Sequence, residues 1–97
     1  MVTYEITAKV GKHLAGEYEQ YMRERHIPDL LETGAFHHAQ FSVCGDELYQ
    51  VRYEAKSRED LDIYLNLHAA RFRTDFLRRF PEGVELSRRE WDIVQTW

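Results

Sequence analysis

The chain has 97 residues, enough for one packed domain, so we expect a single domain over residues 1–97. Its net charge of −4 argues against nucleic acid or an anionic membrane as a partner, because both attract basic surfaces. No apolar stretch approaches the length that spans a bilayer. The single cysteine, Cys44, cannot form an intrachain disulfide, and the first residues lack a signal peptide's basic and apolar regions. We therefore expect a cytoplasmic protein.

The first elements in the chain are a strand and an interrupted helix. Apolar residues alternate with polar ones over residues 2–10, which predicts a half-buried strand. From Leu14 to His26 the apolar residues recur at helical spacing. Pro28 lacks an amide hydrogen and clashes with the preceding turn, so we expect the helix to kink or restart there. Gly34 predicts its end.

A β-hairpin follows. Residues 36–44 and 49–55 both alternate with the period of a strand. The Gly45-Asp46 pair between them is typical of a tight hairpin turn.

A second helix and a last strand complete the chain. Ser57, followed three residues later by an acidic residue, predicts the start of the helix. The apolar positions drift around the helix axis after Asp75, so we expect a bend or break near Thr74. The last strand, residues 84–94, changes phase between Leu86 and Trp91, which suggests a β-bulge.

The order of elements is β-α-β-β-α-β. This is the ferredoxin-like arrangement of the α+β class, in which an antiparallel sheet carries two helices on one face. The other sheet face is polar and is expected either in solvent or between subunits. Its residues are Thr3, Glu5, Thr7, His38, Gln40, Ser42, Gln50 and Arg52. The fold leaves the activity open, because it hosts many unrelated functions.

Two histidines are the strongest candidates for a catalytic role. His68 interrupts the apolar stripe of the second helix, and His26 borders that of the first. If both helices cover one sheet face, the two imidazoles approach one cavity. Such a pair suits acid–base chemistry or metal binding, because histidine titrates near neutral pH. The alternative is that each is a core histidine bonded to a backbone carbonyl or a tyrosine.

Arginines and tyrosines near these histidines are the candidate ligand-binding residues. Arg71 and Arg73 suit a carboxylate or phosphate, because a guanidinium binds two oxygens at once. Tyr18 and Tyr64 would wall the same space. The alternatives are a solvated helix edge with Arg71 paired to Asp75, and tyrosines that serve the core. No cysteine pair or histidine spacing predicts a metal site.

Several segments resemble a known family. The most specific run from Arg25 to Leu31, with the His-Ile-Pro segment, and from His68 to Arg73. They are similar to a bacterial domain-of-unknown-function family of short proteins in the dimeric α+β-barrel superfamily. The resemblance implies a homodimer closed sheet to sheet, among relatives that include cofactor-free monooxygenases, haem-degrading enzymes and stress-related barrels. It implies no catalytic set, and it leaves the cofactor unknown.

Two functional hypotheses follow. The first is a small-molecule binder, or an enzyme acting on an anionic small molecule, that uses a helix–sheet pocket. The second is a non-catalytic dimerisation or stress-related module with structural histidines. In either case we expect Gln40, Gln50 and Arg52 to form hydrogen bonds between the subunits of a homodimer. A cavity that touches both histidines would favour the first hypothesis.

Overall fold

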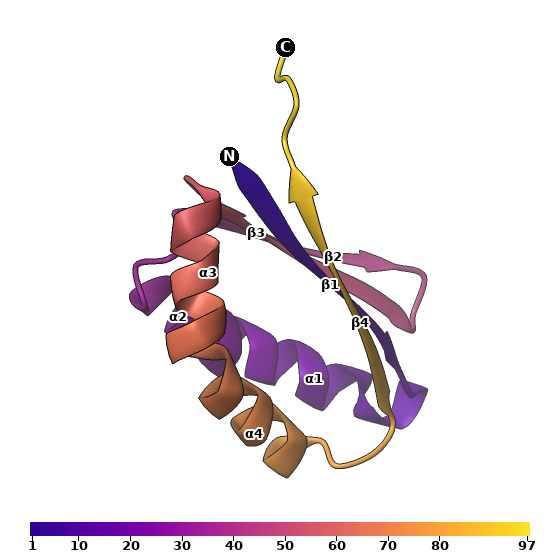
Figure 1. Ribbon diagram of the computed structural model, residues 1–97. Helices are drawn as coiled ribbons and strands as arrows, with labels where there is room; N and C mark the ends of the chain where they lie inside the picture. The colour runs from indigo at the N-terminus through magenta and orange to yellow at the C-terminus, as the bar shows by residue number, and fades with distance from the viewer.

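The computed structural model describes residues 1–97 as one layer of helices on one face of a four-stranded antiparallel sheet (Figure 1). The sheet order is β2-β3-β1-β4. The elements are β1 (Val2–Val10), the 3₁₀ turn η1 (Lys12–Leu14), α1 (Ala15–Tyr21), the π-helical turn η2 (Met22–His26), α2 (Ile27–Glu32), β2 (His38–Cys44), β3 (Leu48–Ala55), α3 (Arg58–Leu67), α4 (Ala69–Arg79) and β4 (Val84–Asp92). The predicted ferredoxin-like α+β architecture is confirmed.

The first helical segment changes its hydrogen-bonding pattern just before Pro28. The Ile27 amide donates to the Met22 carbonyl, five residues earlier, as in a π-helix. Pro28 then occupies the first turn of α2, where its missing amide hydrogen costs little. The expected restart is therefore a widened turn, and it ends at His26.

The second helix breaks at His68, so the predicted break near Thr74 is wrong. His68 has φ −122° and ψ −33°, and it separates α3 from α4. Thr74 lies inside α4, where its hydroxyl donates to the Ala70 carbonyl. Within α4 the buried aromatics Phe72 and Phe76 keep one stripe. The apolar drift therefore reflects the change of direction at His68.

The last strand has no bulge, so that prediction is also wrong. Its register with β1 is continuous, from Val2 opposite Asp92 to Val10 opposite Val84. Polar residues on the helix-facing side broke the apolar alternation. One of them, Glu90, forms an ion pair with Arg58 of α3.

The core lies between the helices and the sheet and is rich in aromatics. Tyr18, Phe36, Tyr53 and Tyr64 are buried there with aliphatic residues from β1 and β3. The opposite sheet face, called the open face below, is polar as predicted.

No helix is both long and apolar enough to cross a membrane.

Candidate functional site

A small pocket lies between the helices and the β1–β4 side of the sheet. Its volume is about 30 Å³. We call it the helix–sheet pocket; it is lined by Tyr4, Ile6, Tyr18, Met22, His26, Tyr64, Phe72, Arg73, Phe76, Leu86 and Arg88. Apolar and aromatic side chains form most of its wall, and the polar groups are few, as in ligand pockets.

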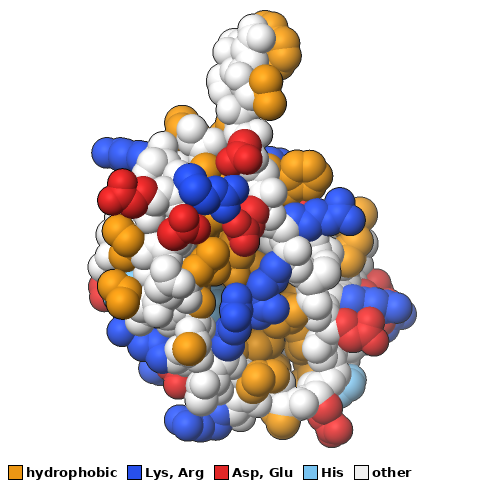
Figure 2. Space-filling model, in the orientation of Figure 1, with side chains coloured by type: hydrophobic (Ala, Val, Ile, Leu, Met, Phe, Trp, Pro, Cys, Tyr) orange, Lys and Arg blue, Asp and Glu red, His pale blue; other side chains and the backbone are white.

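Arg73 of α4 and Arg88 of β4 meet at this pocket. Both are exposed, and neither has a carboxylate within 4.0 Å. Figure 2 shows basic side chains over the opening between helices and sheet, with hydrophobic side chains behind them. Burial raises the pKa of Tyr64 above its ordinary value, and the positive charges of Arg73 and Arg88 oppose this rise. The arginines are unpaired cations beside an apolar pocket.

His26 is the buried polar group of this site. Its exposed fraction is 8%, and its Nδ1 atom has no hydrogen-bond partner. The rings of Phe72 and Phe76 lie 6.0 and 5.8 Å from the imidazole, centre to centre. Burial lowers the pKa of His26 from 6.5 to about 4, although the charge of Asp29 acts in the opposite direction. The imidazole is therefore neutral at pH 7 and offers a free lone pair or a free N–H.

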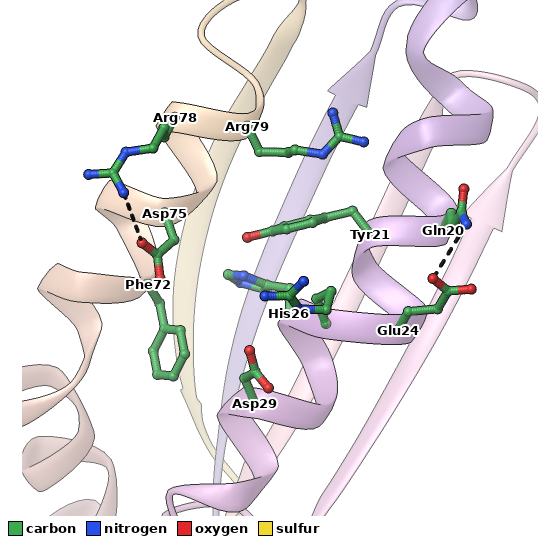
Figure 3. A pocket seen from close by; sticks show the side chains of 10 residues that line it. Gln20, Tyr21, Glu24, His26, Asp29, Phe72, Asp75, Arg78 and Arg79 are labelled. Carbon is green, nitrogen blue, oxygen red and sulfur yellow. Dashed lines mark hydrogen bonds and ion pairs between the residues drawn. The ribbon is translucent and has the colours of Figure 1, made fainter.

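A larger surface groove lies on the other side of His26 (Figure 3). We call it the inter-helix groove; its volume is about 520 Å³, and it is lined by Gln20, Tyr21, Glu24, Arg25, His26, Asp29, Phe72, Asp75, Arg78 and Arg79. Asp75 pairs with Arg78 at 4.0 Å. The groove shares His26 and Phe72 with the helix–sheet pocket, so the imidazole stands between the two.

His68 lies in a different place from His26. It lines a neighbouring groove of about 480 Å³ together with Asp29, Arg71, Phe72 and Asp75. The guanidinium of Arg71 lies 4.7 Å from the centre of the Phe72 ring. The structure thus brings His68 and Arg71 together, and it brings His26 to Tyr18, Tyr64 and Arg73. The two histidines line separate cavities, rather than the single one expected.

Arg88 is the site residue that sequence reasoning missed. It follows Leu86 by two positions, so an unbroken strand places both side chains on the helix-facing side. The expected bulge hid this relation. Continuous period-two counting along β4 would have found Arg88.

No cluster of side chains suited to a metal ion is found, and the helix–sheet pocket as it stands is too small for haem. No three His, Cys, Asp or Glu residues are grouped to hold a metal ion. The helix–sheet pocket holds the unpartnered His26 nitrogen, yet its 30 Å³ is far below the roughly 300–1,000 Å³ typical of ligand pockets. Haem, like any ligand of that size, could enter only if the pocket opened.

His68→Leu should leave stability unchanged or raise it by up to about 1 kcal/mol. The His68 Nδ1 atom is buried without a partner, so the substitution removes an unsatisfied group and orphans nothing. Urea unfolding followed by circular dichroism measures the change. A loss of about 1–3 kcal/mol would instead identify His68 as a structural hydrogen-bonding residue.

The sequence matches one family model, Domain of unknown function (DUF4286), over residues 1–94. The chain belongs to this family. No curated protein matches it.

Three solved structures share the fold of this DUF4286 member. A dimeric ferredoxin-like protein from an uncultured marine organism has a TM-score of 0.78 at 10% identity, covering 99% of this chain and 96% of that one. The haem degrader MhuD from Mycobacterium tuberculosis, with two haems bound, has a TM-score of 0.73 at 19% identity, covering 100% and 99%. A proposed antibiotic biosynthesis monooxygenase from Deinococcus radiodurans has a TM-score of 0.69 at 12% identity, covering 100% and 96%. These TM-scores establish a common ferredoxin-like fold.

Proposed function

We propose that this protein binds an anionic small molecule with an apolar body in the helix–sheet pocket. One observation carries the proposal: Arg73 and Arg88 stand without carboxylate partners beside an apolar, aromatic pocket. A guanidinium is well suited to a carboxylate, sulfonate or phosphate, because it donates two parallel hydrogen bonds. The apolar part of the ligand would pack on Tyr18, Tyr64 and Phe72.

Binding requires the pocket to open. Its 30 Å³ holds about one water molecule. Both arginines are long, flexible and exposed, so they can turn outward and close again over a ligand. The ligand's negatively charged group would then take the place of water around the guanidinium groups of Arg73 and Arg88.

His26 has the chemistry of a general base in this proposal. Its imidazole is neutral and has an unpartnered nitrogen, so it can accept a proton. Burial makes it a weak base, and a bound anion would strengthen it by stabilising the imidazolium. His68 and Arg71 line the neighbouring groove and are not among the residues that line this pocket.

Two of the similar structures support a small-molecule role. MhuD is a haem degrader, and the Deinococcus protein is a proposed monooxygenase. A non-catalytic module is the second candidate, and the nearly filled helix–sheet pocket favours it.

We also propose a homodimer formed through the open face. A similar structure is a dimeric ferredoxin-like protein. Gln40 and Arg52 are exposed on this face and Gln50 is half-buried, so their side chains are available for hydrogen bonds to a second copy.

Titration with anilinonaphthalene sulfonate tests the binding proposal, because this dye is both apolar and anionic and fluoresces in apolar surroundings. We expect native protein to bind it, and Arg73→Gln or Arg88→Gln to weaken binding by about three- to tenfold. Added salt should weaken it further.

Arg89→Gln is the matched control for the dye titration. Arg89 follows Arg88 in β4 and lies on the open face, opposite Glu5. It should change dye affinity by less than about twofold. Equal losses in all three variants, or no binding by the folded native protein, would contradict the proposal.

A further inference from the structure

Two large apolar side chains stand out on the polar open face. Leu48 is 43% exposed and Trp91 is 44% exposed. They lie at opposite ends of the sheet, because Leu48 pairs with Lys9 at the end of β1 and Trp91 pairs with Thr3 at its start. An exposed tryptophan on a sheet face is a common anchor of protein interfaces.

A hollow lies beside Leu48. Its volume is about 160 Å³, and its walls include Thr7, Ser42, Cys44 and Gln50 from the open face. This space suits one indole ring. The Trp91 of the same chain lies at the other end of the sheet and cannot enter it.

We propose that Trp91 of each copy enters the hollow beside Leu48 of the other. The inference rests on the face-to-face homodimer proposed above and fixes its orientation. Trp91 lies on β4, whereas the hollow lies on the β1–β3–β2 side of the sheet. A two-fold axis that lies between the sheets, perpendicular to the line from Trp91 to the hollow and so oblique to the strands, exchanges these two positions. The same contact then forms twice, as an isologous interface requires.

The charges of the open face are compatible with this self-association. The face carries three basic and three acidic strand residues: Lys9, Arg52, Arg89, Glu5, Glu54 and Glu85. Its formal charge is therefore zero with His38 neutral, and two copies approach without net repulsion. Arg52 already lies 3.8 Å from Glu5 within one copy. The apolar pairs at the two ends provide the hydrophobic part of the interface.

Light scattering over a concentration series, combined with thiol labelling, tests the inference. We expect a two-chain mass at micromolar concentration, with Trp91→Ala and Leu48→Asp each raising the dimer dissociation constant by at least about tenfold. Trp97→Ala is the matched control, because Trp97 is 99% exposed outside the strands, and it should leave the constant unchanged.

Cys44 reports on the hollow directly, since it is the single thiol and is exposed in one copy. Its reaction with an aromatic disulfide reagent should be slow in the native dimer and at least about tenfold faster in Trp91→Ala. A dimer with rapid Cys44 labelling and no response to Trp91→Ala would overturn this inference and leave the homodimer standing. A single-chain mass for the native protein would overturn both, without affecting the dye-binding result.

Discussion

Lowering the pH from 7 to 4 should reduce the free energy of unfolding by about 3 kcal/mol through His26 alone. The pKa of His26 is 6.5 when unfolded and about 4 in the folded state, because burial disfavours the imidazolium. Between these values the unfolded chain binds more protons than the folded one, so stability falls as the pH falls. The difference in pKa, at 1.36 kcal/mol per unit, gives the stated size.

Urea unfolding at several pH values, in native protein and two variants, isolates this contribution. His26→Leu should raise stability at pH 7 by roughly 1–2 kcal/mol, since it removes the unpartnered Nδ1 from an aromatic environment. It should also lose about 3 kcal/mol less than native protein on acidification. His13→Asn, a change at an exposed histidine outside the sheet, should keep the full native loss. Equal acid sensitivity of His26→Leu and native protein would contradict the burial of a neutral imidazole.

The fold followed from the sequence because local pattern and tertiary packing agree in most elements. The alternation of β3 matches its burial residue by residue, and that of β1 does so except at Thr3, which is buried on the open face. The Ser57 cap forms, with its hydroxyl oxygen accepting from the Asp60 amide. The two errors arose where polar residues lie on a buried side. At His68 and in β4 they altered the apolar pattern, and a pattern alone does not separate a break from a polar substitution.

Most residues of the candidate site could be predicted from the sequence, but how they are arranged in space was predicted less well. His26 was identified because it borders an apolar stripe, and Arg73 because a guanidinium suits an anion. Tyr18 and Tyr64 were expected to wall the same space, and all four residues line one pocket. His68 was expected in the same space. The break at this residue redirects α4, so its side chain lines a groove toward α2, and helical periodicity carries no information about such a turn.

The position of His26 links local backbone structure to the proposed chemistry. The π-helical turn adds a residue to the regular spacing and ends at His26, immediately before the segment that Pro28 begins. Such turns occur often at functional sites, because they redirect one side chain at some cost in stability. The unpartnered imidazole of His26 fits this pattern, because it too lowers stability at a place where function would use it. A purely structural residue at this place would be expected to be apolar or hydrogen-bonded.

Tyr53→Phe should raise the free energy of unfolding by about 1–3 kcal/mol. The Tyr53 side chain is fully buried, and its hydroxyl has no hydrogen-bond partner. Removing the oxygen eliminates the cost of burying an unsatisfied polar group, and the aromatic ring keeps its contacts with Tyr4 and Phe36.

Tyr49→Phe, four residues earlier on the same strand and face, provides the contrast. Its hydroxyl donates to the Glu19 carboxylate at 2.7 Å, so this substitution should lower the unfolding free energy by about 1 kcal/mol. Chemical denaturation of both variants at pH 7 measures the two changes in the free energy of unfolding, which should have opposite signs. A loss in Tyr53→Phe as large as that in Tyr49→Phe would mean that a bound water or ligand satisfies the Tyr53 hydroxyl. The aromatic core would then contain a polar site, because the Tyr53 hydroxyl stabilises the fold only if it has a hydrogen-bond partner.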